Sequence, residues 1–277
     1  MRLKSRVLLL GGATLLTVNI ISITAQADTS LTYIETSSVP TRTTHIHIHG
    51  KTVRMEEANS STYLLYDDSK PILYNINTRA QQYIINTPQT IRERAKKTAE
   101  LQRQTQAALK QQLAMMPEEQ RASVQANQQQ TELQRQTPAP NIRLEKTDKQ
   151  DSVAKLACSI TQLTVDGQVE REICNAAADA IPATDLQTLV HMFGYLDNMA
   201  AESAKAQGIT PPAQGTAILH KAGLALRIQA ITVGGYHSEL NAWDTKTALD
   251  DALFSLPRDF HAFEPSVKDV TMQHPTH

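Results

Sequence analysis

Aromatic and cysteine residues are scarce in this chain of 277 residues. Phe, Trp and Tyr make up 4% of it, and there are only two cysteines. The apolar fraction is 40%, slightly below the usual globular value, so the chain can build one modest core. Lys and Arg number 27 against 28 Asp and Glu, a formal charge of -1. This balance argues against a nucleic-acid-binding protein, because such proteins carry a basic surplus.

Common catalytic motifs are also missing from the sequence. Neither Gly-x-Gly-x-x-Gly nor a Walker pattern occurs, so no Rossmann or P-loop nucleotide site is expected. There is no Gly-x-Ser-x-Gly nucleophile elbow, and a Cys–His pair is excluded if the two cysteines form a disulfide. We therefore expect a protein that is not an enzyme.

The N-terminus has the pattern of a secretory signal peptide. A basic start precedes an apolar run that ends near Ile23, and Ala25-Gln26-Ala27 is a small-x-small cleavage site. We predict a signal peptide over residues 1–27, cleaved after Ala27, and a periplasmic location; an uncleaved membrane anchor is the alternative. No later stretch reaches about 18 consecutive apolar residues, so we expect a soluble mature chain without a transmembrane segment.

The two cysteines, Cys158 and Cys174, are predicted to form a structural disulfide, because an even count in an exported protein favours pairing. Two free buried thiols are the alternative. Asp166-Gly167 predicts a hairpin turn between them. A two-residue turn would place Cys158 opposite Asn175, whereas a register shifted by one would place the cysteines opposite each other. We therefore predict a β-bulge between the turn and the cysteine pair.

Periodicity divides the rest of the chain into three zones. The zone of residues 31–86 holds an alternating stretch at 41–55 and short segments rich in Tyr, Ile and Leu at 61–66, 71–76 and 81–85. With turns between them, these segments predict an antiparallel meander. Residues 87–136 form a Gln-rich helical insertion that begins at Thr87-Pro88, and Pro117 divides it into two helices. The second helix, to about Arg135, has almost no apolar face.

The third zone mixes strands with one strongly amphipathic helix. Strands are predicted at 142–146, 154–165, 169–174, 224–233 and 237–243, and the helix starts near Thr184-Asp185. A polar tail, 266–277, ends the chain; Met272, His274 and His277 lie in it, with disorder as the simpler interpretation. Because strands dominate both ends and helices come as inserted blocks, the pattern indicates an α+β fold with an antiparallel sheet.

Three histidines, His45, His47 and His49, alternate with isoleucines. On a strand they share one face, with neighbouring side chains about 6–7 Å apart. A His-x-His pair can begin a Zn or Cu site that a distant residue completes, and His237 is a candidate for that role. The alternative is a solvated or hydroxyl-paired polar face.

Five segments of the chain resemble an exported bacterial family, domain of unknown function 4412. They are Gly50-Lys51-Thr52-Val53-Arg54-Met55, the Tyr74-to-Tyr83 hairpin, Met116-Pro117-Glu118-Glu119-Gln120-Arg121, the Cys158-to-Cys174 hairpin and Leu253-Phe254-Ser255-Leu256-Pro257. That family is distantly similar to periplasmic lipoprotein-carrier half-barrels. The resemblance implies a curved antiparallel sheet, or half-barrel, whose helices line or plug its concave face. It supplies no active-site residues, and the three histidines are not part of its pattern.

These observations predict one half-barrel domain over residues 28–265. By analogy of fold we expect a non-enzymatic periplasmic binding or carrier-like module for an apolar ligand, a lipid-linked segment or a partner peptide. The alternative function is metal binding by the His45, His47 and His49 cluster, with Zn or Cu as its ion; otherwise no cofactor is expected. The partner would be an apolar ligand or a periplasmic protein.

Overall fold

One large sheet organises the computed structural model of the protein, which describes residues 28–36, 41–115, 140–206, 215–231 and 235–265. Its 12 strands lie in the order β12-β6-β5-β4-β3-β2-β1-β11-β10-β9-β8-β7. All neighbours are antiparallel except β12 and β6. The strands are β1 Thr29–Thr36, β2 Arg42–His49, β3 Thr52–Glu57, β4 Thr62–Asp67, β5 Ile72–Asn77, β6 Gln82–Asn86, β7 Ile142–Val153, β8 Leu156–Val165, β9 Gln168–Ala176, β10 Ala225–Ala230, β11 His237–Asp244 and β12 His261–Ala262.

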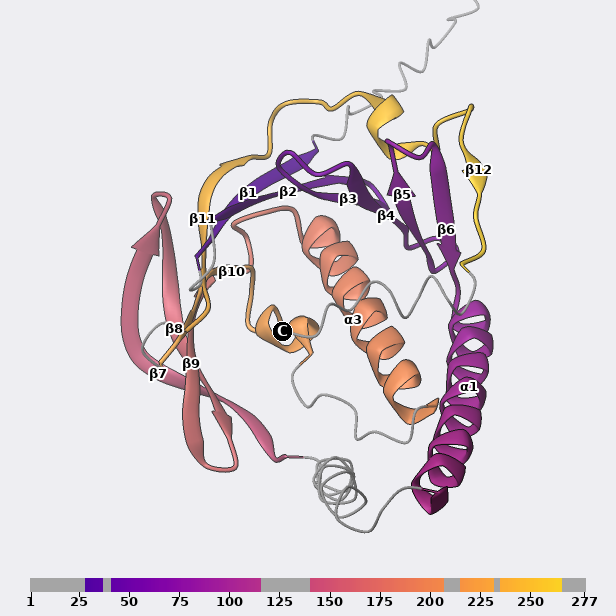
Figure 1. Cartoon of the computed structure of the whole chain (residues 1–277). Coiled ribbons are helices and arrows are strands. Elements are labelled where there is room, and N and C mark those ends of the chain that lie inside the picture. The colour runs from indigo at the N-terminus through magenta and orange to yellow at the C-terminus, as the bar shows by residue number, and fades with distance from the viewer. Residues whose placement is uncertain (1–27, 37–40, 116–139, 207–214, 232–234, 266–277) are drawn as a thin grey trace, which may run out of the picture.

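The sheet is open and strongly curved, and helices occupy its concave side (Figure 1). The predicted α+β half-barrel with inserted helices is confirmed. Helix α3, Ala183–Ala206, lies against the inner face, where its Leu189 and Met192 are fully buried with Ile46 and Ile48 of β2. The alternation of β2 explains this arrangement, because its isoleucines face the helix and its histidines face the other way.

The predicted meander is present as β1 to β6, although the sequence analysis missed β1. Gly50, with φ +56°, occupies the β2–β3 turn where the left-handed conformation favours glycine. β1 completes the sheet by pairing with β2 on one side and with β11 on the other. Because β11 follows more than two hundred positions later, β1 is the strand that joins the two ends of the chain into one sheet.

Helix α1, Pro88–Met115, follows β6 as predicted, with proline in its first position. Thr87 caps it: its hydroxyl accepts from the Thr90 amide at 3.1 Å, and the Thr90 hydroxyl accepts from the Thr87 amide at 2.9 Å. Ile91, Ala95 and Leu113 are its buried residues, and α1 packs beside α3 (Figure 1). The predicted second helix of the insertion, the signal peptide and the polar tail lie outside the described residues.

The disulfide joins Cys158 of β8 to Cys174 of β9, with 5.4 Å between their Cα atoms. The two-residue Asp166-Gly167 turn and a bulge are also present, the bulge between Leu163 and Thr164. The predicted direct pairing of the cysteines is wrong: Cys158 lies opposite Ala176, and Cys174 lies opposite Ile160. The extra residue is on β9 and not on β8, so the register shifts in the opposite direction and the disulfide runs diagonally.

Several short elements were not predicted. A turn at Ala154-Lys155 separates β7 from β8, where the sequence analysis began β8 two residues too early. Helix α4, Thr216–Leu219, covers the inner face near β9 and β10. A 3-10 helix, η1 Asp251–Phe254, precedes β12. Among the described residues, no helix is long and apolar enough to span a membrane.

Candidate functional site

The concave face is already filled by the protein's own helix. Leu189, Met192 and Phe193 of α3 belong to one buried cluster with Leu31 of β1 and Leu73 of β5. The hydroxyl of Tyr195 in α3 donates to the Asn86 carbonyl at 2.8 Å, which fixes the helix to the end of β6. An apolar ligand on this face would therefore compete with α3.

The three histidines lie on one face of β2, as their alternation predicted, and this is the convex face of the sheet. Hydroxyl groups of β1 contact two of them: Ser30 Oγ lies 3.0 Å from His47 Nδ1, and Thr32 Oγ1 lies 3.1 Å from His45 Nδ1. The rings of His45 and His47 are nearly parallel, with centroids 6.4 Å apart. The hydroxyl-paired polar face that the sequence analysis left open as the alternative is thus present for these two residues.

The surroundings of His47 favour its neutral form. Burial is the main cause that lowers its pKa, and the neighbouring His45 and Arg54 act in the same direction, against the opposing effect of Glu56. Arg54 donates to Glu56 at 2.6 Å, and its guanidinium lies 3.8 Å above the ring of Tyr63. This part of the convex face is a tightly paired polar surface.

His49 is separated from the other two by different partners. Its Nδ1 lies 2.7 Å from Asp28 Oδ1, and its ring stacks on Phe254 with centroids 5.2 Å apart. Phe254 belongs to the segment between β11 and β12. This segment, gold to yellow in Figure 1, crosses the convex face. This segment is also held by the Arg54 side chain, which donates to the Leu253 carbonyl.

Within the described ranges, no group of three or more His, Cys, Asp or Glu side chains is arranged to hold a metal ion. The suggestion that His237 completes a site with the histidines of β2 is wrong. His45 of β2 lies opposite Thr32 along one edge of β1, whereas His237 of β11 lies opposite Thr36 along the other edge. The step from Thr32 to Thr36 alone corresponds to about 13 Å along the strand.

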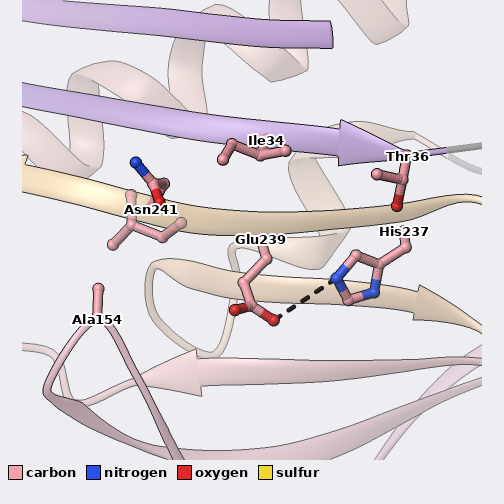
Figure 2. Close-up of a pocket in the computed structure, with 7 residues that line it drawn as sticks. Ile34, Thr36, Ala154, His237, Glu239 and Asn241 are labelled. Carbon is pink, nitrogen blue, oxygen red and sulfur yellow. Dashed lines mark ion pairs between the residues drawn. The ribbon is translucent and has the colours of Figure 1, made fainter. Parts of the chain in front are cut away.

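His237 instead lines a groove that the sequence analysis did not foresee. The groove has a volume of about 500 Å³ and lies between β11 and the β7–β8 turn. Figure 2 shows Ala154 of that turn across from Asn241, with Glu239 and His237 farther along the same strand as Asn241. The described lining residues are Ile34, Thr36, Ala154, His237, Glu239, Leu240 and Asn241. Asn241 projects here because it is the extra residue of a bulge opposite Thr32 and Tyr33.

A row of alternating charges runs beside this groove. His237 Nε2 lies 3.5 Å from Glu239 Oε2, and Arg227 lies 3.9 Å from the same oxygen. Arg227 also forms a 2.6 Å ion pair with Asp151 of β7, which lowers the pKa of that exposed carboxyl. The register explains the row, because Cys174 lies opposite Arg227 and Cys158 opposite Asp151. The disulfide therefore joins β8 and β9, the two strands that lie between β10, which carries Arg227, and β7, which carries Asp151.

Three other histidines of the described ranges have partners that sequence alone did not identify. His191 Nδ1 lies 3.0 Å from both carboxylate oxygens of Asp68. His220 is buried, stacks on Phe193 and accepts from the Ala225 amide at 3.3 Å; burial lowers its pKa to about 4. His261 contacts Gln82 across the β12–β6 pair. Asp68, Phe193 and Gln82 are distant in sequence from the histidines they contact, so no local pattern indicated these partners.

Comparisons with known proteins give only distant similarities. No family model and no curated protein matches the chain. Similar solved structures include PNGF-II in its C2 crystal form, with TM-score 0.39 and 9% identity. An uncharacterised conserved protein from Thermus thermophilus has TM-score 0.41 and 7% identity, and MucB has TM-score 0.36 and 10% identity.

These alignments cover 89%, 86% and 85% of this chain, in the same order. The chain spans 32% of PNGF-II, 91% of the Thermus thermophilus protein and 59% of MucB. At such low TM-scores and identities, the similarities carry no argument about function.

Proposed function

We propose that this protein is a periplasmic, non-enzymatic binding module that holds a partner peptide in the groove between β11 and the β7–β8 turn. The observation that carries the proposal is the groove itself, of about 500 Å³, lined by both apolar and hydrogen-bonding side chains. A peptide offers both kinds of group along its length. The membership in the family of unknown function suggested by the sequence remains part of this proposal.

The groove has the chemistry that an extended peptide requires. Ile34 provides an apolar contact, while Asn241 and Thr36 offer donors and acceptors to a peptide backbone. The Glu239 side chain is 43% exposed, so its carboxylate can also accept hydrogen bonds from the amide groups of a peptide.

An apolar ligand or a lipid-linked segment is the less favoured occupant, because α3 covers the concave surface it would need. These occupants remain outcomes of the test. Native mass spectrometry of protein purified from periplasm distinguishes them: a copurified lipid would contradict the peptide proposal. N-terminal sequencing of the same sample should begin Asp28-Thr29-Ser30, whereas a retained Met1 would contradict export with cleavage.

The peptide proposal itself is tested with a displayed library of random peptides and the purified mature protein. We expect recovered peptides to bind in fluorescence anisotropy and to lose at least tenfold in affinity with Asn241→Trp, which fills the groove from an exposed position. Lys70→Trp adds the same side chain at an exposed turn remote from the groove and should bind as the unaltered protein does. Equal affinities for the two variants would refute the assignment of the groove.

Metal binding by the convex histidines is the second candidate function. One observation favours it: hydroxyl groups of β1 contact Nδ1 of both His45 and His47. When Nδ1 donates to an oxygen, the neutral ring keeps its lone pair on Nε2, as in many histidine ligands of metal sites. Two such rings would need a further ligand to hold Zn or Cu tightly.

A further inference from the structure

The first residues of the predicted mature chain lie in an unusual environment. Thr29 is fully buried, and its hydroxyl donates to Asp185 Oδ2 at 2.6 Å. Asp28 has a side chain that is only 2% exposed; its carboxylate accepts from the Leu249 amide at 2.6 Å and contacts His49. Chain ends are normally exposed and loosely held. The buried side chains of Asp28 and Thr29 show that this part of the chain is instead packed into the fold.

Asp185, in the first turn of α3, carries a buried carboxyl group. It is 1% exposed, and its described hydrogen-bond partners are the hydroxyls of Thr29 and Thr184. No Lys, Arg or His of the described ranges forms an ion pair with it. Burial is the main cause that raises the pKa of its carboxyl; the hydrogen bonds from Thr29 and Thr184 and the nearby His49 oppose this effect, and the negative charge of Asp28 adds to it. A buried carboxylate normally has a cationic partner.

Cleavage after Ala27 would create a cation at this place. It converts the amide nitrogen of Asp28 into an α-ammonium group, which is charged at neutral pH because its usual pKa is about 7.7–8.0. This nitrogen is one residue away from Thr29, whose hydroxyl already touches Asp185. A buried ammonium requires an anion, and a buried carboxylate requires a cation.

We propose that Asp185 is the acceptor site for the α-ammonium group that signal-peptide removal creates on Asp28, so that maturation forms an ion pair between β1 and α3. The inference rests on cleavage after Ala27 and is independent of the peptide groove. Three groups come together at the mature terminus: Asp185 holds the ammonium, the Asp28 carboxylate holds the Leu249 amide, and His49 lies beside that carboxylate. The precursor has no ammonium at this position, and the ion pair is therefore specific to the processed protein.

The rate of amine labelling at pH 7 tests the ion pair directly. An ion pair raises the pKa of the amine, and each unit lowers its reactive neutral fraction about tenfold. We expect the Asp28 amine of the mature protein to react at least tenfold more slowly than the same amine in a short Asp28-Thr29-Ser30 peptide, as measured by mass spectrometry of the N-terminal fragment. Asp185→Asn should increase the labelling rate of the Asp28 amine about tenfold, because it removes the negative charge and keeps an acceptor for the Thr29 hydroxyl. Asp251→Asn is the control, since Asp251 is close to His49 but 90% exposed.

A second measurement does not depend on the Asp185 variant folding. A protein that retains Ala27 has its ammonium displaced by one residue. It should unfold at a lower urea concentration than the mature protein at pH 7, because the pair is then lost. The difference should vanish near pH 10: an amine with a raised pKa stabilises the fold below its unfolded pKa and loses that effect as pH rises through its folded value. Asp185→Asn labelling at the rate of the unaltered protein, or an Ala27 effect that is the same at both pH values, would overturn the proposal.

Discussion

Reduction of the Cys158–Cys174 disulfide should destabilise the protein by about 3 kcal/mol. The two cysteines are separated by 16 positions, and the loop-entropy model gives this value for a loop of that size. A domain is usually stable by only about 5–15 kcal/mol, so the effect is a large fraction of the total. The cross-link lies in a buried place, with Cys158 4% and Cys174 1% exposed.

The comparison of oxidised and reduced wild-type protein isolates the cross-link, because both keep the sulfur atoms in the core. Replacement of both cysteines by alanine removes packing as well and should cost more. The reduced protein should also bind groove peptides less tightly. Asp151 and Arg227 form their ion pair across the two strands that the disulfide joins, so loosening these strands weakens that pair.

Urea unfolding with and without reductant measures the effect. With a slope of about 2–3 kcal/mol/M, a loss of about 3 kcal/mol shifts the midpoint by roughly 1 M. Alkylation and intact mass must show two thiols in the reduced sample and none in the oxidised one. Coincident midpoints for two samples that pass this check would refute the loop-entropy reasoning, and two alkylated thiols in unreduced native protein would refute the disulfide itself.

Three further predictions follow from single sites. His47→Ala should abolish tight Zn²⁺ or Cu²⁺ uptake in calorimetry while His191→Ala retains it, and weak binding by the unaltered protein would exclude the metal function. His220 has a pKa lowered to about 4 by burial, so the unfolded chain binds the extra proton and stability falls as pH drops from about 6.5 to 4. His220→Asn keeps an acceptor for the Ala225 amide and should remove up to about 3 kcal/mol of this acid sensitivity in urea titrations; an unchanged pH profile would contradict the assignment. Gly223 has φ +133°, and a Cβ there would collide with the Ala176 carbonyl oxygen, so Gly223→Ala should lose well over about 1 kcal/mol in thermal unfolding. Gly194→Ala meets only ordinary contact with Ala217 and should not be destabilising, and equal losses for the two alanine variants would contradict the steric argument.

The sequence predicted the elements that carry their own signals. The turns after β2 and β8 contain glycine with positive φ, and the Thr87-Pro88 start of α1 is a local capping pattern. β1 was missed because its first residues are short and polar and follow directly on the predicted cleavage site. It is paired along both edges, with β2 and with β11, and local periodicity cannot indicate a partner as distant as β11.

The disulfide shows where local reasoning stopped. Sequence geometry indicated that a bulge was needed but not which strand would hold the extra residue. The bulge on β9 allows Leu163 and Ile173 both to be fully buried beneath Leu219 of α4. Since α4 has only four residues, the sequence carries no clear signal for it, nor for the apolar contact that favours this register.

The same limit applies to the histidines. Alternation correctly placed His45, His47 and His49 on one face. Their chemistry, however, depends on which residues β1 and the segment after β11 bring beside them. Pairing with β1 puts hydroxyls next to two of the rings. The segment after β11 puts Phe254 beside the third, so the three side chains do not share one environment.

The filled concave face bears most directly on what the protein can carry. Leu189, Met192 and Phe193 of α3 are buried against the sheet, and exposing such side chains costs about 1.5–3 kcal/mol each. A ligand that displaced the helix would have to offset about 5–9 kcal/mol for exposing these three side chains, which is comparable to the stability of a whole domain. A peptide in the groove beside β11 displaces none of these three residues, because the residues that line the groove come from β1, β11 and the β7–β8 turn and not from α3. This difference in cost is the physical reason to expect binding at the groove before binding within the half-barrel.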